Sequence, residues 1–440
     1  MLRWGELGRE VLRVAWPMIV SQVAESLYAV LDTFFVSRLG TTAVAALALG
    51  SYMSWLLFVV VALFSTGTMV FVAQSYGAKE LEKARRAIGQ TMIMALAVSA
   101  AAGVCGWLAS EPLARLVGGS SPSVVEQATR YFRIRSLGLP ASALAMVVDS
   151  SVRAVGATKL SMIATVSSAA LNMVLDPILI YGLLGLPKLG VAGAALAMVL
   201  SIAYMIPLEL AFLKRLGVFP RLTLGIGYAL RVARIGIPTA TERLVFAIGN
   251  NIYIAFISRC GSIALAAHQI GLRIESFVYM PGFAFSIAAA ALVGHRVGKG
   301  SVGEGKSAGL EAAKIGAALM TITGVGLAAI APIAVKPFTT NPEVAKLATI
   351  YLILAGLSEP GLALAMILSN AIRGGGNTLV PMLVNAIGLY LFRVAPSYIA
   401  TKTMGVIGAW IAMFIDVYAR GITFLILYKK KFHKLAKKVI

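Results

Sequence analysis

Two helical faces carry the residues whose types and spacing can do chemistry. The first lies in the apolar segment from residue 16 to 40, which is long enough to cross a bilayer. Along it, polar side chains recur at spacings that stack them on one face of a helix: Ser21, Glu25, Tyr28 and Asp32. A charge at bilayer depth is costly. An acid there either marks a functional site facing protein or water, which we favour, or is a satisfied structural carboxylate.

The second polar face lies in the apolar segment from residue 161 to 181. It carries Thr165, Ser168, Asn172 and Asp176, again at helical spacings. Both segments are predicted to run outward, which places Asp32 and Asp176 at similar depth in the outer half of the membrane. Two carboxylates facing each other in a low-dielectric pocket cannot both stay charged without a cation between them. The pair therefore either shares a proton or coordinates a hard cation such as Na⁺, with Tyr28 and Asn172 one turn further inward completing the site.

Weaker candidates surround these two faces. The residues predicted to line a substrate cavity are Ser21, Gln22, Glu25, Met146, Asp149 and Ser168. Met146 suits an adaptable apolar cavity, although ordinary helix packing is the favoured explanation. Asp149 lies four residues before Arg153, so a local ion pair is the favoured alternative for this acid.

In the second half of the chain, Glu275 and Arg393 are the polar candidates. They are predicted to form a buried pair that stabilises this half, unless Glu275 meets a cationic substrate. Glu242, Glu359 and Asp416 lie nearer to predicted helix ends. We interpret these three acids as interfacial anchors.

The elements that must position these residues are membrane-spanning helices. Hydrophobic residues make up 59% of the 440 residues and charged residues only 13%, a composition typical of polytopic membrane proteins. Apolar windows predict twelve spans, near residues 12–36, 45–73, 88–109, 126–153, 160–183, 190–213, 228–257, 263–294, 308–331, 344–371, 379–400 and 405–428. The predicted fold class is an all-α membrane protein of twelve transmembrane helices, with the lipid bilayer as its surroundings and no room for a sizeable soluble domain.

The placement of the basic residues predicts the orientation of the chain. The net charge is +21, but the basic residues lie in short loops and in a lysine-rich tail, so no basic domain is present to bind nucleic acid. With a cytoplasmic amino terminus, about 24 of them fall in inside segments and about 8 in outside segments. This bias predicts a multi-pass protein of the cell membrane with both termini in the cytoplasm.

The second half of the chain repeats the first. The matched pairs are Pro17 and Pro238, Ser37–Gly40 and Ser258–Gly261, Arg153–Thr158 and Arg373–Thr378, and Val191–Ala194 and Val406–Ala409. Since each copy holds an even number of spans, both copies insert in the same orientation, as in transporters with a substrate site between two halves. At this offset Asp32 corresponds to Tyr253 and Asp176 falls near Pro396, so the second half lacks the acid pair.

We predict four parts: an N-terminal lobe (1–213) of six spans with the cation and substrate site, a cytoplasmic linker (214–227), a C-terminal lobe (228–428) of six spans and a basic cytoplasmic tail (429–440). The two cysteines, Cys105 and Cys260, lie in or beside apolar spans and indicate neither a disulfide framework nor a metal cluster. No phosphate-cradling loop, zinc-protease motif or nucleophile elbow occurs. We therefore expect no enzyme activity and no cofactor other than the coupling ion, with Na⁺ at Asp32, Asn172 and Asp176 as the only metal considered.

The ordered set of motifs resembles the multidrug and toxic compound extrusion (MATE) family over nearly the whole chain. The motifs that carry the resemblance are Trp16-Pro17, Asp32-Thr33-Phe34-Phe35, Ala45-Ala46-Leu47-Ala48, Arg153-Ala154-Val155-Gly156-Ala157-Thr158, Leu175–Gly182, Gly190–Ala195 and Ala266-Ala267-His268-Gln269. The resemblance implies a two-lobed, V-shaped bundle of twelve helices that exports drugs or other organic cations in exchange for Na⁺ or H⁺. The paired aspartates Asp32 and Asp176, with no matching pair in the second half, are similar to the DinF and archaeal branch. That branch implies a cation and substrate site at Asp32, Asp176, Tyr28 and Asn172.

The sequence departs from this family pattern at two positions. Asp149 stands where an amide is expected, and Glu25 stands where a neutral polar side chain is expected. The extra negative charge would shift preference towards more cationic substrates or alter the coupling stoichiometry.

The sequence predicts a secondary active antiporter with alternating access between its lobes. Inward cation movement resets Asp32 and Asp176, and a small amphipathic, cationic substrate leaves through the first lobe; we expect a monomer. The alternative is a flippase for a lipid-linked sugar, which shares the bundle type but requires a cationic cavity for the diphosphate. A membrane receptor or scaffold without transport is a third hypothesis, and the two polar faces argue against it.

Overall fold

The described part of the chain is built from helices alone. A computed structural model describes residues 4–118 and 121–440, and every regular element in these ranges is helical, which confirms the predicted all-α fold class. The first half contains α1 (Trp4–Ser37), α2 (Thr41–Gly77), α3 (Leu81–Leu108), α4 (Ser110–Gly118), α5 (Pro122–Leu137), α6 (Leu139–Ala154), α7 (Thr158–Tyr181) and α8 (Val191–Arg215).

The second half follows the same plan with two short irregular elements, η1 and η2. It contains α9 (Gly227–Ser258), α10 (Ser262–Gly298), α11 (Val302–Val335), the 3₁₀ turn η1 (Lys336–Phe338), α12 (Pro342–Gly374), α13 (Leu379–Gly388), the π-helical segment η2 (Leu389–Val394), α14 (Ala395–Met404) and α15 (Val406–Leu435).

Ten helical segments of the described residues are long and apolar enough to cross a membrane. The helices that contain these segments coincide with ten of the twelve predicted spans to within several residues. The other two predicted spans are helical but are not among these ten segments. Residues 126–153 are divided between α5 and α6, and residues 228–257 lie in α9, whose Arg231, Arg234 and Arg243 reduce its apolar character.

Gly138 explains the division between α5 and α6. Its backbone stays in the helical region (φ −79°, ψ −4°), and Pro140 follows in the first turn of α6. The side chain of Val199 on α8 occupies the space that a Cβ at residue 138 would need. The two short helices therefore follow each other with little change of direction and pack closely against α8.

The helices pack into two compact units, described separately below. The N unit is Val20–Ala240, and the C unit is Thr241–Ile440 together with Met1–Ile19. These boundaries differ from the predicted lobes 1–213 and 228–428 at two helices. The beginning of α1 packs with the C unit, where Val11 and Ala15 join its core. The beginning of α9 packs with the N unit, where Gly67 and Gly236 allow α2 and α9 to approach closely.

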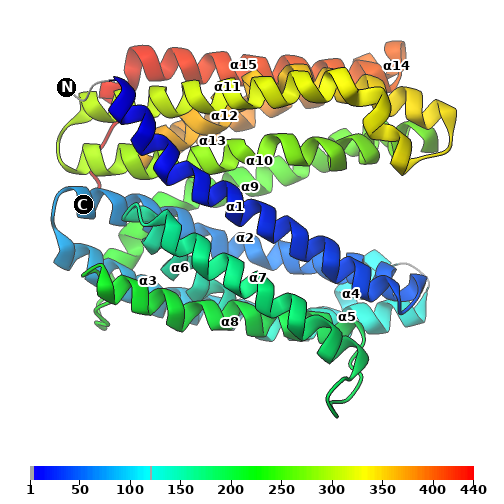
Figure 1. Cartoon of the computed structure of the whole chain (residues 1–440), viewed down its shortest axis with the longest axis horizontal. Coiled ribbons are helices and arrows are strands. Elements are labelled where there is room, and N and C mark those ends of the chain that lie inside the picture. The colour runs from blue at the N-terminus through cyan, green and yellow to red at the C-terminus, as the bar shows by residue number, and fades with distance from the viewer. Residues whose placement is uncertain (1–3, 119–120) are drawn as a thin grey trace. The chain divides into compact units, whose positions relative to one another are not determined.

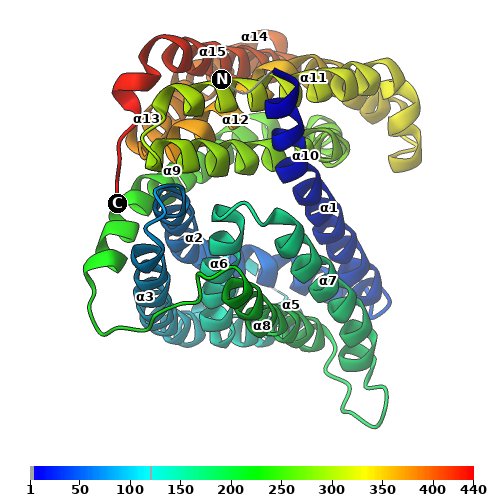
Figure 2. The same cartoon turned by 60° about the vertical axis from the view of Figure 1, so that its left-hand side comes forward.

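In the N unit, α6 occupies the centre. It contacts α2 and α3 on one side and α7 and α8 on the other (Figure 2). Its buried side chains Val147, Val148 and Val152 pack with Phe64 of α2 and Leu213 of α8 in one core. This arrangement brings the ends of α6, α7 and α8 together and so positions their polar residues.

In the C unit, α10, α11, α12 and α15 lie side by side along most of their length (Figure 1). One core contains Phe285, Phe424 and Tyr428, and a second contains Tyr351 and Trp410. Both are rich in alanine and glycine, which lets the helix backbones approach closely.

The repeat seen in the sequence is also present in the backbone. Gly40 and Gly261, which precede α2 and α10, both have a positive φ (109° and 105°) that a side chain would strain. The same agreement holds for Gly190 (φ 58°) before α8 and Gly405 (φ 62°) before α15. Corresponding turns in the two halves therefore use the same backbone conformation.

Candidate functional site

Asp32 of α1 and Asp176 of α7 interact within the N unit. Asp176 is fully buried and Asp32 is half-buried, and the two carboxylates repel each other when both are ionised. Asn172 donates from its Nδ2 to Oδ1 of Asp176 at 3.4 Å. Within the described ranges, no hydrogen bond reaches Oδ1 of Asp32, Oδ2 of Asp176 or Oδ1 of Asn172. The arrangement presents three buried acceptor oxygens without donors, which suits a proton or a small cation.

Arg135 of α5 is the charged neighbour that sequence reasoning missed. Its guanidinium acts electrostatically on Asp32 and on the hydroxyl groups of Tyr28 and Tyr131. Its Nε and Nη1 are buried and have no hydrogen-bond partner in the part of the chain that the structure describes. The spacing of Tyr131 and Arg135, four residues apart, is the signal that could have placed both on the site-facing side of a helix.

Tyr131 closes the site on the side of α2. It is 3% exposed, and its hydroxyl accepts a hydrogen bond from Ser51 at 3.5 Å. Gly50 on α2 makes room for it, since a Cβ there would collide with the Tyr131 ring. The site thus combines two acids, one amide, one guanidinium and two tyrosines from α1, α5 and α7.

The polar face of α1 divides between two clusters. Tyr28 is half-buried beside Arg135 and Asp32. Ser21 is buried, and Gln22 is half-buried with its backbone carbonyl accepting from Ser26 at 2.9 Å. Glu25 is exposed, and its charged partner is Arg153 of α6 rather than the aspartate pair.

Asp149 belongs to a second polar cluster at the end of α6. It is buried, forms an ion pair with Arg153 one turn along α6, and accepts a hydrogen bond from Ser161 of α7 at 2.5 Å. Glu209 of α8, which sequence reasoning also missed, is fully buried and lies near Arg153. Because Glu209 lies near the end of an apolar span, the sequence did not distinguish it from the charged residues that are common at helix ends.

Two other predicted cavity residues are used in packing. Ser168 is buried and donates to the backbone carbonyl of Ser201 on α8 at 2.7 Å. Met146 packs against the core around α6. Both side chains hold helices of the N unit together.

Glu275 and Arg393 are both buried and act on each other electrostatically, but each has its direct hydrogen bonds with another residue. Glu275 accepts a hydrogen bond from the hydroxyl of Tyr351 at 2.5 Å, and Arg393 bonds to Asp416 through Nε at 3.0 Å and Nη2 at 2.9 Å. Arg393 lies in the π-helical segment η2.

Three acids predicted as interfacial anchors are instead in the interior of the C unit. Asp416 and Glu359 are both 0% exposed, and Glu242 accepts two hydrogen bonds from Arg373 and one from Asn385. Distance from a helix end along the sequence did not reveal that neighbouring helices cover these positions.

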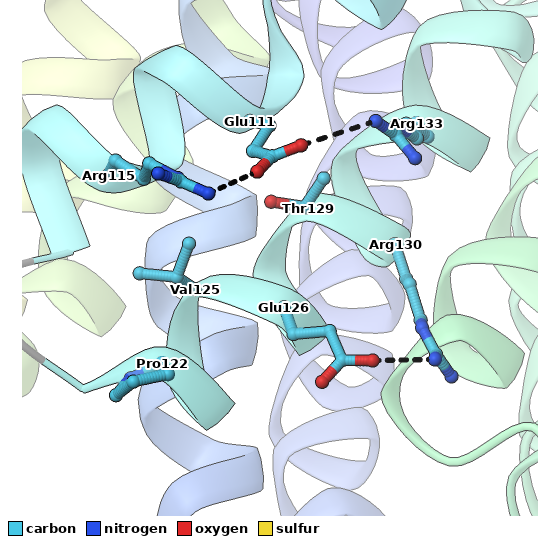
Figure 3. A pocket seen from close by; sticks show the side chains of 8 residues that line it. All are labelled: Glu111, Arg115, Pro122, Val125, Glu126, Thr129, Arg130 and Arg133. Atoms are coloured by element: carbon cyan, nitrogen blue, oxygen red, sulfur yellow. Dashed lines mark hydrogen bonds and ion pairs between the residues drawn. The ribbon is translucent and has the colours of Figure 1, made fainter.

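A surface cavity of about 610 Å³ lies between α4 and α5, away from the residues predicted for the site (Figure 3). Its charged side chains are paired with one another: Arg115 with Glu111 and Arg130 with Glu126, both at 2.6 Å, and Arg133 with Glu111 at 4.0 Å. All are at least two-fifths exposed, so these pairs are weak surface interactions.

Comparison with known families identifies the class of protein. The MatE family model matches the chain twice, over residues 17–178 and 238–399. The two matches begin at Pro17 and Pro238, the prolines paired in the sequence repeat. The chain therefore belongs to the MatE family of multi-pass membrane transporters, as the resemblance predicted.

Similar proteins cover almost the whole chain. A probable multidrug resistance protein NorM of Thermotoga maritima is 28% identical over 429 residues, which is 94% of this chain and 91% of that protein. A FAD transporter of Shewanella oneidensis is 23% identical over 94% of this chain and 93% of its own length. The MATE transporter VcmN of Vibrio cholerae in its bent form has a TM-score of 0.91 at 19% identity, covering 98% of both chains.

A further solved structure shares the fold. It is a MOP superfamily transporter of Pyrococcus furiosus described by the reverse polarity of its binding pocket, with a TM-score of 0.89 at 22% identity, covering 98% of this chain and 97% of that one.

Proposed function

We propose that this protein is a secondary active exporter in which inward movement of H⁺ or Na⁺ through Asp32 and Asp176 drives the outward movement of a small amphipathic cation. The observation that carries the proposal is the set of three buried oxygens without donors on Asp32, Asn172 and Asp176. A carboxylate pair in such a place requires positive charge, which a coupling ion supplies in one state and the substrate replaces in another.

The charges of the site limit the number of coupling ions. Asp32 and Asp176 carry two negative charges when ionised, and Arg135 contributes one positive charge. One further monovalent cation or proton completes neutrality. We infer that one coupling ion is exchanged in each transport cycle.

The proposed substrate class depends on the charge of the residues in the N unit and on the names of related proteins. The aspartate site and the second polar cluster of the N unit together contain five acids, Glu25, Asp32, Asp149, Asp176 and Glu209, and two arginines, Arg135 and Arg153. This excess favours a cationic substrate, and relatives named as multidrug resistance proteins support a broad range of small molecules. The proposal includes the cell membrane as location, cytoplasmic termini and action as a monomer.

Purified protein in proteoliposomes tests the proposal, with export of a fluorescent organic cation measured under separately imposed pH and Na⁺ gradients. We expect one of the two gradients to drive export in the wild type. Asp32→Asn and Asp176→Asn should each reduce export to the level of empty vesicles with unchanged thermal unfolding. Glu111→Gln, an exposed acid of the same unit, serves as the control and should export normally. Undiminished export by both aspartate variants would contradict the proposal.

A further inference from the structure

Glu209 is a buried acid that the aspartate pair does not explain. It lies on α8 and is 0% exposed, and neither of its carboxylate oxygens has a hydrogen-bond partner in the described residues. An ionised carboxylate buried without donors is strongly unfavourable. The Glu209 carboxyl group is therefore neutral in this conformation and holds a proton.

The charged groups near Glu209 can compensate for the loss of that proton. The charged groups of the cluster are Glu25 on α1 and Asp149 and Arg153 on α6. Arg153 is paired with Asp149, and its Nε has no hydrogen-bond partner among the residues described. The Arg153 guanidinium thus has a spare donor for the Glu209 carboxylate.

The cluster and the aspartate pair lie towards opposite ends of the N unit. Glu209 is six residues before the end of α8, Arg153 is in the last turn of α6, and Ser161 is in the first turn of α7. Asp176 is five residues before the other end of α7. By the predicted orientation, the Glu209 cluster is at the cytoplasmic end.

The polar face of α7 joins the two places. Ser161, Thr165, Ser168, Asn172 and Asp176 are spaced by four, three, four and four residues and are all buried. The first of them donates to Asp149 at 2.5 Å, and the last is one of the aspartate pair. A continuous line of polar side chains therefore runs along one helix from the outer acids to the inner cluster.

The chemistry of the cluster favours a proton over a metal cation. Na⁺ requires several oxygen ligands around it. The guanidinium of Arg153 lies beside Glu209 and repels a second cation, whereas a proton needs only one carboxylate oxygen.

We propose that Glu209 is the proton-release site of the N unit. The O–H bond of Glu209 breaks when water reaches the cluster, a water molecule accepts the proton as hydronium, and the free Nε–H of Arg153 bonds the Glu209 carboxylate left behind. The inference rests on the proposed antiport and adds that its coupling ion is a proton that leaves at this cluster.

The test compares Glu209→Gln with the wild type as full-length protein in proteoliposomes. Glutamine keeps the shape of the neutral acid but cannot release a proton. We expect the infrared absorption of one protonated carboxylic acid to disappear, export driven by a pH gradient to fall at least about tenfold, and substrate exchange without a gradient to continue. Glu126→Gln, an exposed acid paired with Arg130, is the matched control and should change none of these.

Glu209→Asp keeps a titratable carboxyl and gives a second readout that does not depend on how well the glutamine variant folds. It should retain a shifted protonated-acid absorption and part of the proton-driven export. The inference is overturned if both variants keep the wild-type absorption and export, or if only a Na⁺ gradient drives the wild type. In either case, loss of export in Asp32→Asn would leave the proposed antiport standing, whereas normal export by the aspartate variants would remove the antiport itself.

Discussion

Single residues set the charge of the candidate site. Among them, we expect Arg135 to have the largest effect on the number of coupling ions exchanged in each transport cycle. Replacing it with glutamine removes the one positive charge that acts on Asp32. The aspartate pair then needs two monovalent cations instead of one, so we expect the ratio of coupling ions to exported substrate to rise from one to two. The measurement is the gradient of the coupling ion at which the net transport of substrate changes direction, with the substrate gradient held fixed.

Arg133→Gln is the matched control for that change. Arg133 lies on the same helix, two residues away, but it donates to Ser110 at 2.9 Å and packs over the Trp107 ring. Its removal should leave the ratio unchanged. A ratio that stays at one in Arg135→Gln would show that Arg135 takes no part in neutralising the aspartates.

The residue scale also shows what the sequence could and could not predict. The spacing of polar residues on α1 and α7 was enough to place Asp32, Asn172 and Asp176 on facing stripes, because helical periodicity depends on one helix at a time. The four-residue spacing of Tyr131 and Arg135 was a signal that the prediction did not use, and Glu209 was missed because its importance depends on which neighbouring helix faces it. That information lies in packing between helices, which periodicity along one helix does not contain.

At the scale of whole elements, buried ion pairs fix how the C unit packs. Asp416 of α15 accepts from Arg393 of η2 and from Arg420 one turn along α15, with Nε–Oδ distances of 3.0 and 2.7 Å. Arg420 continues the network to Asn385 at 3.3 Å. The network joins α13, η2 and α15 through a single carboxylate that is 0% exposed.

Asp416→Asn should therefore destabilise the protein strongly. The substitution leaves two buried guanidinium groups without a compensating charge, which typically costs about 3–5 kcal/mol. We expect a clear loss in the free energy of unfolding in detergent, with the choice of coupling ion unchanged in the protein that remains folded. Glu343→Gln, at an exposed helix start, should change stability by no more than about 0.5 kcal/mol. Equal stability of the two variants would mean that the pairs around Asp416 contribute little.

The elements themselves were predictable to different degrees. Long apolar windows gave the positions of the helices to within several residues, since bilayer thickness requires about 20 apolar residues. The division at Gly138 and the π-helical segment at Leu389–Val394 were not foreseen. Both depend on contacts with other helices, as the close approach of Val199 to Gly138 shows.

At the scale of the whole molecule, the repeat is visible in the sequence and in the backbone, and the sequence predicts the orientation in the membrane. The glycines before α2 and α10 share one backbone conformation, and the family match occurs twice at the same offset. The halves nevertheless differ in chemistry, because Tyr253 occupies the place of Asp32 and packs in an apolar core. One architecture thus carries the aspartate pair in one half and a different set of buried charges, among them Glu359 and Asp416, in the other.

The orientation predicts which face of the membrane each native cysteine is near. Cys260 lies in the turn between α9 and α10, and Cys105 lies in the last turn of α3. With cytoplasmic termini, both positions are on the outside. A membrane-impermeant maleimide added to intact cells should therefore label the wild-type protein, mainly at Cys260, since Cys105 lies within a span. Cys260→Ser should lose most of that labelling.

A cysteine at an inner turn completes the test. In a background with Cys105→Ser and Cys260→Ser, Glu304→Cys places a thiol at the exposed start of α11, on the predicted cytoplasmic side. Removing an acid there does not weaken the positive charge that sets the orientation. We expect labelling only after the membrane is permeabilised. Labelling of Glu304→Cys in intact cells, together with protection of Cys260, would show that the orientation is the opposite of the predicted one. The outer acids would then face the cytoplasm, and the direction of ion and substrate movement through Asp32 would be reversed.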